Sequence, residues 1–295
     1  MKYILEQPNN KNVDLRDLQL KNLEILKYFD SFCKKHDLKY TLCGGCCIGA
    51  LRHEGFIPWD DDIDVHMFRE DYEKLFKLWS KFADKDKYKI VRTTKNDYQD
   101  TMLTQISMNN TTFIKNNQVD KDINHGIKLE VIPLDGAPES NFKRKIQLFN
   151  ALKFYLYNRG FAPENRGKLF NIVGKILLFF RKTPNSRYKL WKRAEKNMTK
   201  YSIESSKYIT ELCVTWKYMK IKYPKEIFLG ERLAKFEDGF YPIPYNSEKY
   251  LNMAFGDYTK LPKEEDRKPK HDAILIDLDK SYEEYKNIYY LKDKR

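Results

Sequence analysis

The chain has 295 residues, a formal net charge of +13 and an apolar content of 41%. This length is enough for one large domain or two smaller ones with a substantial core. The mean hydropathy of −0.73 argues against a polytopic membrane protein, and no stretch reaches the ~18 apolar residues that a membrane-spanning helix needs. Since residues 1–12 also lack the apolar region of a signal peptide, we expect a cytoplasmic protein.

The spacing of apolar residues predicts a mixed α/β core, of the α/β or α+β class, in the first part of the chain. In chain order we expect a helix over 14–36, a strand over 39–43, a helix over 46–52, a strand over 62–67, a helix over 71–82, and strands over 88–93, 102–108, 111–114 and 126–133. Gly44 and Gly45 form a tight turn that opens the second helix. The strands that flank Asn109 and Asn110 are expected to pair as a hairpin.

A basic helical segment follows this core. Residues 141–200 contain sixteen lysines and arginines against two acidic residues, so the segment carries a charge of +14 and the remainder of the chain −1. The last third is rich in proline, which predicts short elements joined by loops. We therefore divide the chain into a core over 1–138, a basic amphipathic helical segment over 139–201 and a C-terminal portion over 202–295 that completes the site.

The five cysteines are odd in number, and three of them, Cys43, Cys46 and Cys47, crowd one short loop. A disulfide framework is therefore not expected. Residues 43–46 have the CxxC spacing of a zinc or redox site, but a structural zinc site usually has a second ligand pair at similar spacing, which the sequence lacks. We favour small buried thiols in a reducing compartment.

The run of residues 60–64, Asp-Asp-Asp-Ile-Asp, is the most informative part of the chain. In an extended strand alternate residues point to the same face, so Asp60, Asp62 and Asp64 share one face while Ile63 points into the core. Without a cation such a face costs stability through like-charge repulsion, and with a divalent cation it becomes a binding site. The alternative is a solvated acidic turn ahead of the next helix.

Two further features complete this site. A diglycine turn that opens a helix presents backbone N–H groups and the positive end of the helix dipole to phosphate oxygens. The strand over 126–133 presents Glu130 on the face opposite to Leu129 and Val131. A phosphate cradle, paired carboxylates and a third carboxylate on another strand together predict a two-metal site for phosphoryl or nucleotidyl transfer, with Mg²⁺ or Mn²⁺ as the ions.

These motifs resemble the signature of the LicD family, which are bacterial phosphotransferases of the nucleotidyltransferase superfamily; fukutin-type proteins share the motif. The resemblance is carried by YTLCGG (40–45), GALRH (49–53), GFIPWDDDIDV (55–65), EVIPLD (130–135) and FGDY (255–258). It is dense over residues 15–135, absent from the basic segment and patchy over 228–271. Cys46 stands where the family usually has Thr or Ser, and Glu130 stands where it usually has Asp.

The resemblance implies a nucleotidyltransferase-like core and the transfer of phosphocholine from CDP-choline to a sugar hydroxyl of a cell-surface glycan or its lipid-linked precursor. Carried over by position, Asp62 and Asp64 would be metal ligands. Glu130 would be the third acidic ligand and the group that activates the acceptor hydroxyl. The same site would also suit CDP-ribitol, CDP-glycerol or the transfer of a nucleotidyl unit. A non-catalytic glycan-binding adaptor is a further alternative, against which the intact carboxylates count.

The substrate contacts implied by the resemblance are Gly44, Gly45, Cys46, Arg52 and His271. Arg52 has two interpretations, because an arginine fork suits a phosphate, whereas a cation at a helix C-terminus is favoured without any ligand. His271 and the basic residues beside it either close over the nucleotide or form a solvated basic tail.

Three interpretations of the basic segment are open: a solvated helical face, a nucleic-acid surface and a membrane surface. No nucleic-acid-binding module accompanies the charge, so we do not expect nucleic acid as a partner. The apolar residues within 169–180, flanked by Arg and Lys, suit an anionic lipid surface. We therefore expect a protein bound peripherally to the inner face of the cell membrane.

Overall fold

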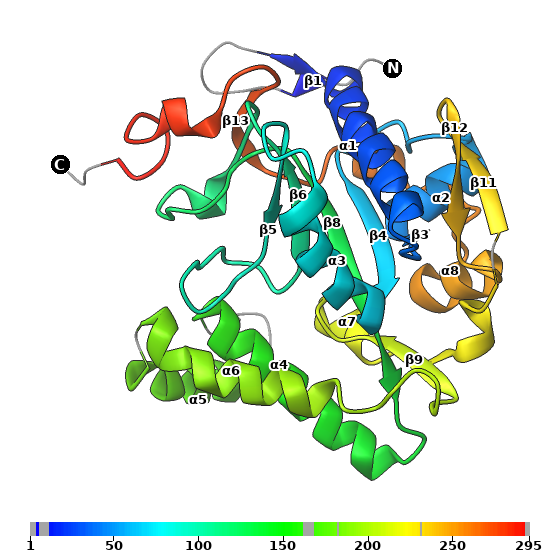
Figure 1. Ribbon diagram of the computed structural model, residues 1–295, viewed down its shortest axis with the longest axis vertical. Coiled ribbons are helices and arrows are strands. Elements are labelled where there is room, and N and C mark those ends of the chain that lie inside the picture. The colour runs from blue at the N-terminus through cyan, green and yellow to red at the C-terminus, as the bar shows by residue number, and fades with distance from the viewer. Residues whose placement is uncertain (1–3, 6–11, 162–167, 182, 231, 293–295) are drawn as a thin grey trace. The chain divides into compact units, whose positions relative to one another are not determined.

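The computed structural model describes residues 4–5, 12–161, 168–181, 183–230 and 232–292 (Figure 1). The chain divides into two compact units. Unit 1 comprises Met1–Val91, Gln105–Val131 and Phe228–Arg295, and unit 2 comprises Arg92–Thr104 and Ile132–Ile227. Helices and strands are mixed along the chain, so the predicted α/β class with a mixed sheet is confirmed. The three-part division made from the sequence stays a prediction.

Unit 1 contains most of the strands. Its helices are α1 (Leu15–Lys35), α2 (Gly44–His53), α3 (Arg69–Phe82) and α8 (Ser247–Phe255), with short 3₁₀ turns η1 (Asn116–Gln118), η4 (Glu264–Asp266) and η5 (Tyr282–Tyr285). Its strands are β1 (Ile4–Leu5), β2 (Val13–Asp14), β3 (Thr41–Leu42), β4 (Ile63–Phe68), β5 (Tyr88–Val91), β6 (Thr104–Met108), β7 (Thr112–Lys115), β11 (Arg232–Phe236), β12 (Gly239–Ile243) and β13 (Ala273–Asp277). Strand β8 (Lys128–Ala137) begins in unit 1 and ends in unit 2.

Strand β4 lies between β3 and β8 in the main sheet. It pairs antiparallel with β3, with Leu42 opposite Val65, and its other neighbour is β8. Strand β8 in turn neighbours β6, which pairs antiparallel with β5. Helices α1 and α3 both pack on β4 (Figure 1). Strands β4 and β8, which carry the predicted ligands, are therefore neighbours in the sheet.

Side-chain alternation in both of these strands is as predicted. In β4, Ile63 and Val65 are completely buried, while Asp64 between them is half-buried. In β8, Leu129 and Val131 are completely buried and Glu130 is half-buried. Because the period of a strand is two, burying the apolar residues directs the carboxylates to the opposite face.

The predicted hairpin at Asn109 and Asn110 is wrong. Strand β6 pairs with β5 and β8, whereas β7 pairs antiparallel with β13, so that Thr112 lies opposite Asp277. Asn110 adopts a positive φ of 55°, as in a tight turn. The local turn signal was therefore correct, but the pairing of the two strands depends on partners that lie far away in the sequence.

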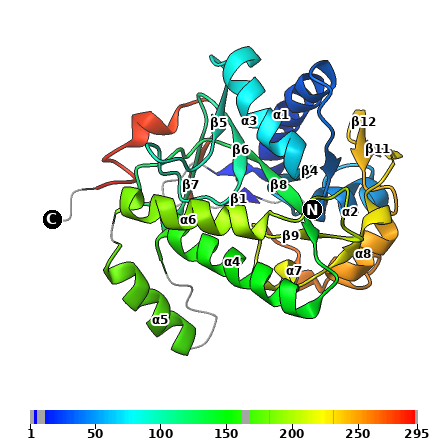
Figure 2. The ribbon, with the colours of Figure 1, turned by 60° about the horizontal axis from the view of Figure 1, so that its bottom comes forward.

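Unit 2 is mainly helical. Its elements are α4 (Asn141–Arg159), α5 (Lys168–Phe179), α6 (Pro184–Met198), α7 (Trp216–Met219), η3 (Lys225–Ile227), β9 (Tyr208–Glu211) and β10 (Tyr223–Pro224). Helices α4 and α6 pack side by side (Figure 2). Strand β9 pairs antiparallel with the end of β8 and with β10. The predicted helical character of the basic segment is confirmed for the residues described.

The cysteines are as expected from their number and spacing. All five are buried and none forms a disulfide. Burial raises the pKa of the Cys46 and Cys47 thiols, that of Cys47 to about 12, so both are neutral near pH 7. They are small packing groups at the start of α2.

Candidate active site

The start of β4 carries the central carboxylates of the site. The Asp62 side chain, just ahead of the strand, is 32% exposed. Asp64, the second residue of β4, has its Oδ1 atom buried, and no described residue donates a hydrogen bond to that atom. A buried carboxylate oxygen without a donor costs stability, so this position needs a functional explanation.

Electrostatic coupling joins these carboxylates to Glu130 of β8. Burial raises the pKa of Asp64 well above its usual range, and the charges of Asp62, Glu130 and Asp60 raise it further. Burial also raises the pKa of Asp62; His271 opposes this rise, and Asp61 and Glu130 add to it. The residues predicted as metal ligands from two strands therefore lie within one interacting cluster.

Glu130 is held in place by a neighbouring strand. The side-chain amide of Gln105, on β6, donates a hydrogen bond of 2.7 Å to Glu130 Oε1. Gln105 is itself buried. A buried amide in this position fixes the direction of the carboxylate, as the partners of functional carboxylates commonly do.

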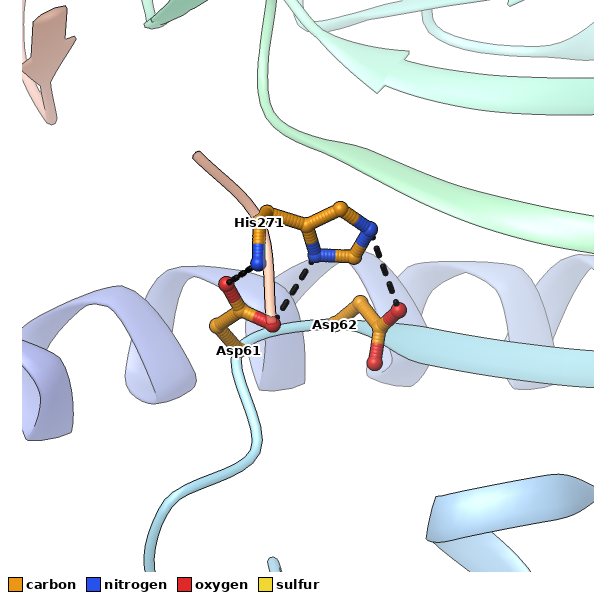
Figure 3. Close-up of side chains that lie close together, drawn as sticks. All are labelled: Asp61, Asp62 and His271. Carbon is orange, nitrogen blue, oxygen red and sulfur yellow. Dashed lines mark hydrogen bonds and ion pairs between the residues drawn. The ribbon is translucent and has the colours of Figure 1, made fainter. Parts of the chain in front are cut away.

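A second group of ligand atoms lies beside the first. Nδ1 of His271 is 2.9 Å from Asp61 Oδ1, and the His271 backbone N–H donates to Asp61 Oδ2 at 3.2 Å. Its Nε2 lies 3.8 Å from Asp62 Oδ2 (Figure 3). Among the described residues, these three form the one group of His, Cys and acidic side chains whose ligand atoms lie within 4.8 Å of one another. This group shares only Asp62 with the ligand set predicted from the sequence.

The pKa of His271 reflects its two acidic neighbours. Burial on its own lowers this pKa, but the hydrogen bond with Asp61 and the charges of Asp61 and Asp62 outweigh burial, so the pKa is raised. His271 lies just ahead of β13, and the pairing of β13 with β7 brings it to a carboxylate 210 positions earlier in the chain. The C-terminal segment thus takes part in the site.

The diglycine turn lies against the acidic residues. A Cβ atom added to Gly45 would be 2.1 Å from Asp60 Oδ2, and one added to Gly44, whose φ is +52°, would be 3.9 Å from Asp64 Oδ2. Only glycine at position 45 allows Asp60 to approach this closely. The Gly44 N–H donates to the Tyr250 hydroxyl at 3.1 Å. Because Cys43 provides no side-chain cap for α2, the start of this helix is suited to an anionic ligand.

Cys46 contacts β4 through its sulfur atom. Its Sγ accepts a hydrogen bond from the Asp64 backbone N–H at 3.5 Å and lies 3.8 Å from the Asp62 carbonyl oxygen. The side chain is 3% exposed. Cys46 therefore fastens the start of α2 to the carboxylate-bearing strand, and the atom with which it can reach a phosphate is its backbone nitrogen.

Arg52 contacts the C-terminal portion of the chain. It donates to the carbonyl oxygen of Tyr258 at 2.8 Å and to that of Lys260 at 3.4 Å. Burial lowers its pKa, as does the nearby charge of Arg267. In the structure the guanidinium holds the loop after α8 against the end of α2. Both interpretations of Arg52 made from the sequence stay predictions.

Helix α1 holds the backbone of the acidic segment, residues 60–64, through buried amide side chains. Gln19 donates to the carbonyl oxygens of Ile57 at 3.2 Å and Asp60 at 2.9 Å, and Asn22 donates to that of Asp61 at 3.0 Å. Both amide side chains are at most 3% exposed. The sequence does contain a signal for these residues. Gln19 and Asn22 fall on the apolar face of an amphipathic helix, where a polar residue needs a hydrogen-bond partner.

Replacing Asn22 by Ala is expected to destabilise the protein by about 1–3 kcal/mol, because the buried Asp61 carbonyl would lose its donor. Chemical denaturation measures this loss. Asn252→Ala, at an exposed position of α8, is the matched control and should change the stability by less than about 0.5 kcal/mol. Equal stability of the two variants would contradict the supporting role of Asn22.

Two lysines add positive charge beside the carboxylates. Lys115, at the end of β7, lowers the pKa values of Asp62 and Asp64, and Lys270 lowers that of Asp60. Despite Lys270, burial and the charge of Asp62 raise the pKa of Asp60 to about 7. From the sequence, Lys270 belongs to the basic residues that either close over the nucleotide or form a solvated tail. The sequence gave no signal for Lys115, whose position depends on the pairing of β7 with β13.

Trp59 directly precedes the acidic run in the sequence. Its ring is 9% exposed, and the Arg267 guanidinium lies 5.8 Å from the ring centroid. Trp59 therefore packs in the core of unit 1, and the cation beside its ring is Arg267 of the same chain.

The donor set fits a hard divalent cation. Carboxylate oxygens from Asp62, Asp64 and Glu130 are the ligands that Mg²⁺ and Mn²⁺ prefer. Asp64 Oδ1 is a buried oxygen without a hydrogen-bond donor among the described residues, and mutual repulsion within the cluster raises the pKa of Asp64. Both features are what a cation would relieve.

Asp62 and Asp64 interact electrostatically at the start of β4, and the diglycine start of α2 lies beside them. In a mixed sheet, this arrangement defines a nucleotidyltransferase-type domain. Residues 37–134 match the family described as "LicD/FKTN/FKRP, nucleotidyltransferase domain". These comparisons support the resemblance to the LicD family that the sequence motifs indicated.

The similarity to one known protein extends beyond residues 37–134. The chain is 29% identical over 278 residues to the "Lipopolysaccharide cholinephosphotransferase LicD" of Haemophilus influenzae, covering 88% of this chain and 97% of that protein. It is 34% identical over 59 residues to an uncharacterized protein of Rickettsia prowazekii, covering 20% of this chain and 22% of that protein. It is 35% identical over 80 residues to an uncharacterized protein of Rickettsia typhi, covering 23% of this chain and 26% of that protein.

Proposed function

We propose that this protein transfers phosphocholine from CDP-choline to a hydroxyl group of a glycan, in a reaction that requires Mg²⁺ or Mn²⁺. The coupled carboxylates of Asp62, Asp64 and Glu130 beside the start of α2 carry this proposal. The name of the Haemophilus relative, a cholinephosphotransferase that the alignment covers almost completely, supports phosphocholine as the transferred group.

Asp62, Asp64 and Glu130 would hold the divalent cation, or two such ions. A bound divalent cation neutralises the diphosphate of the donor and stabilises the oxygen that leaves. The protein contributes rigid positions for the ligands. Gln105 fixes Glu130 from β6, and Cys46 fixes the backbone of Asp64 from α2.

The donor phosphates would bind between α2 and the basic side chains. The backbone N–H groups of Gly45 and Cys46 lie in the first turn of α2, where the helix dipole favours negative charge. Lys115 and Lys270 provide positive charge close to the carboxylates. His271, held by Asp61 through Nδ1, directs Nε2 toward Asp62 and would donate from it to a phosphoryl oxygen.

The acceptor hydroxyl would lose its proton to Glu130. The acceptor oxygen attacks the phosphorus that bears choline and forms a new P–O bond, while the bond between that phosphorus and the bridging oxygen breaks in line with the attack. CMP leaves with the bridging oxygen. The proton of the acceptor passes to the Glu130 carboxylate and from there to solvent.

Release of CMP tests this proposal. Purified protein incubated with CDP-choline, Mg²⁺ and a glycan acceptor should release CMP and label the glycan with phosphocholine, and chelation of the metal with EDTA should stop both. CDP-ribitol and CDP-glycerol serve as competing donors in parallel reactions. A preference for one of them would replace choline as the transferred group, and nucleotide binding without CMP release from any donor would indicate a non-catalytic adaptor.

A further inference from the structure

The first half of helix α4 in unit 2 exposes apolar side chains and buries polar ones, whereas its second half buries Phe154 and Leu156. Phe142, Ile146 and Phe149 are 73%, 41% and 60% exposed. Their spacing of four and three residues places them along one stripe of the helix. On the opposite side, Arg144 and Gln147 are buried, at 5% and 1% exposure. This is the reverse of an ordinary surface helix.

The buried polar residues fix the orientation of α4. Arg144 donates to Gln147 Oε1 at 2.6 Å and to the Thr210 hydroxyl at 2.7 Å. Gln147 donates to the carbonyl oxygens of Gly136 at 2.8 Å and Met198 at 2.9 Å. Rotating the helix to bury its phenylalanines would break the hydrogen bonds to Thr210, Gly136 and Met198 and leave buried polar groups unsatisfied. The apolar stripe is therefore held outward by the packing of unit 2.

Helix α5, which packs on α4, adds further exposed apolar side chains. Ile176, Leu177 and Phe179 are 56%, 42% and 64% exposed. The first part of the predicted apolar stripe, Leu169 to Val173, and Lys182 lie outside the side chains that the structure describes. Arg187, one of the cations that follow the stripe in the sequence, is 5% exposed and donates to the Tyr157 carbonyl oxygen, so it is part of the core.

Positive charge surrounds the stripe. Lys143 and Lys145 are exposed on either side of it, and Lys153 lies over the Phe149 ring at 5.6 Å. With a charge of +14 over residues 141–200, the surface would repel a second copy of itself. A nucleic acid bound to this stripe would contact phenylalanine and isoleucine side chains, whereas its phosphates need cations. An anionic lipid surface satisfies both the apolar and the basic residues.

We propose that the exposed stripe of α4, together with α5, docks on an anionic lipid bilayer, with Phe142, Ile146 and Phe149 at the boundary between headgroups and acyl chains. None of the helices described in the structure is long and apolar enough to cross a membrane, so the docking is interfacial. The proposal does not depend on the transfer reaction, because it rests on unit 2 alone.

Sedimentation with vesicles tests the docking surface. The full chain should bind vesicles of phosphatidylcholine and phosphatidylglycerol at least about tenfold more tightly than vesicles of phosphatidylcholine alone, and salt should weaken the binding. Phe142→Ser combined with Phe149→Ser should reduce the binding at least about tenfold. Phe240→Ser is the matched control, since Phe240 is 64% exposed on β12 of unit 1, and should bind like the wild type.

The charge is tested separately by Lys143→Gln combined with Lys145→Gln, which should weaken binding to the anionic vesicles and leave the melting temperature unchanged. Absence of binding to anionic vesicles, or wild-type binding by the double phenylalanine variant, would overturn the proposal. A wild-type dimer that this variant converts to a monomer would assign the stripe to self-association instead. Binding to nucleic acid that depends on Phe142 and Phe149 would equally overturn it.

Discussion

Replacement of Asp64 by Asn is expected to reduce transfer by at least about 10³-fold, the scale of losing one group that stabilises charge in a transition state. Asn keeps the shape of the side chain but removes the charge that a cation needs. The melting temperature without divalent cation is expected to equal or exceed that of the wild type, because the change removes repulsion with Asp62 and Glu130. Initial rates of CMP release and thermal unfolding measure the two effects.

Asp279→Asn is the matched control for this experiment. The Asp279 side chain is 82% exposed and lies 3.2 Å from Lys21, and exposed ion pairs contribute little to stability. We expect its activity and melting temperature to be those of the wild type. Wild-type turnover by the Asp64 variant would show that this carboxylate takes no part in the reaction. A lowered melting temperature would show instead that it supports the fold.

Replacement of Gly45 by Ala is expected to lower the free energy of unfolding by about 1–3 kcal/mol, the usual cost of forcing an extra methyl group into a packed site. The added Cβ would lie 2.1 Å from Asp60 Oδ2, so either α2 or the acidic segment must move. A shift of this kind beside Asp62 and Asp64 should reduce activity about 10²-fold. Chemical denaturation and CMP release measure the two losses.

A double-mutant cycle identifies the cause of the Gly45 effect. If the clash is with Asp60, then Asp60→Ala combined with Gly45→Ala should lose less stability than the sum of the two single changes. Additive losses would show that the methyl group collides with something else. The stability of Asp60→Ala alone also shows whether this buried carboxyl group, whose pKa is raised to about 7, stabilises or destabilises the folded protein.

The ligand-bearing strands could be predicted because their information is local. Ile63 and Val65 alternate with carboxylates, as Leu129 and Val131 do with Glu130, and burial of the apolar set decides which way each acid points. The diglycine turn is equally local, since Gly44 adopts a positive φ that other residues rarely take. Helix α1, with Asp14 as its N-cap, begins where the spacing of apolar residues predicts.

The remaining parts of the site come from tertiary contacts that no local pattern contains. Gln105 reaches Glu130 because β6 neighbours β8, and the Tyr250 hydroxyl reaches Gly44 across 206 positions. Lys115 depends on the pairing of β7 with β13. That same pairing replaced the predicted hairpin at Asn109 and Asn110, where a correct turn signal said nothing about the partner strand.

The exposed face of α4 could not be predicted from the sequence, because the first half of this helix buries polar side chains and exposes apolar ones. Its apolar spacing predicts an amphipathic helix, and the ordinary inference is that Phe142, Ile146 and Phe149 face the core. In the structure, Arg144 and Gln147 occupy the buried side because Thr210 and backbone carbonyl groups receive their hydrogen bonds. Which face of this helix is buried is thus decided by acceptors elsewhere in unit 2.

A titration of Mn²⁺ followed by electron paramagnetic resonance, in the presence of CDP-choline, tests the account most directly. We predict that the wild type binds Mn²⁺ together with the donor, that Asp64→Asn weakens this binding at least about 10²-fold, and that Glu130→Gln weakens it to a smaller but measurable extent. Equal Mn²⁺ binding by the wild type and the Asp64 variant would contradict a cation held by the carboxylates of β4 and β8.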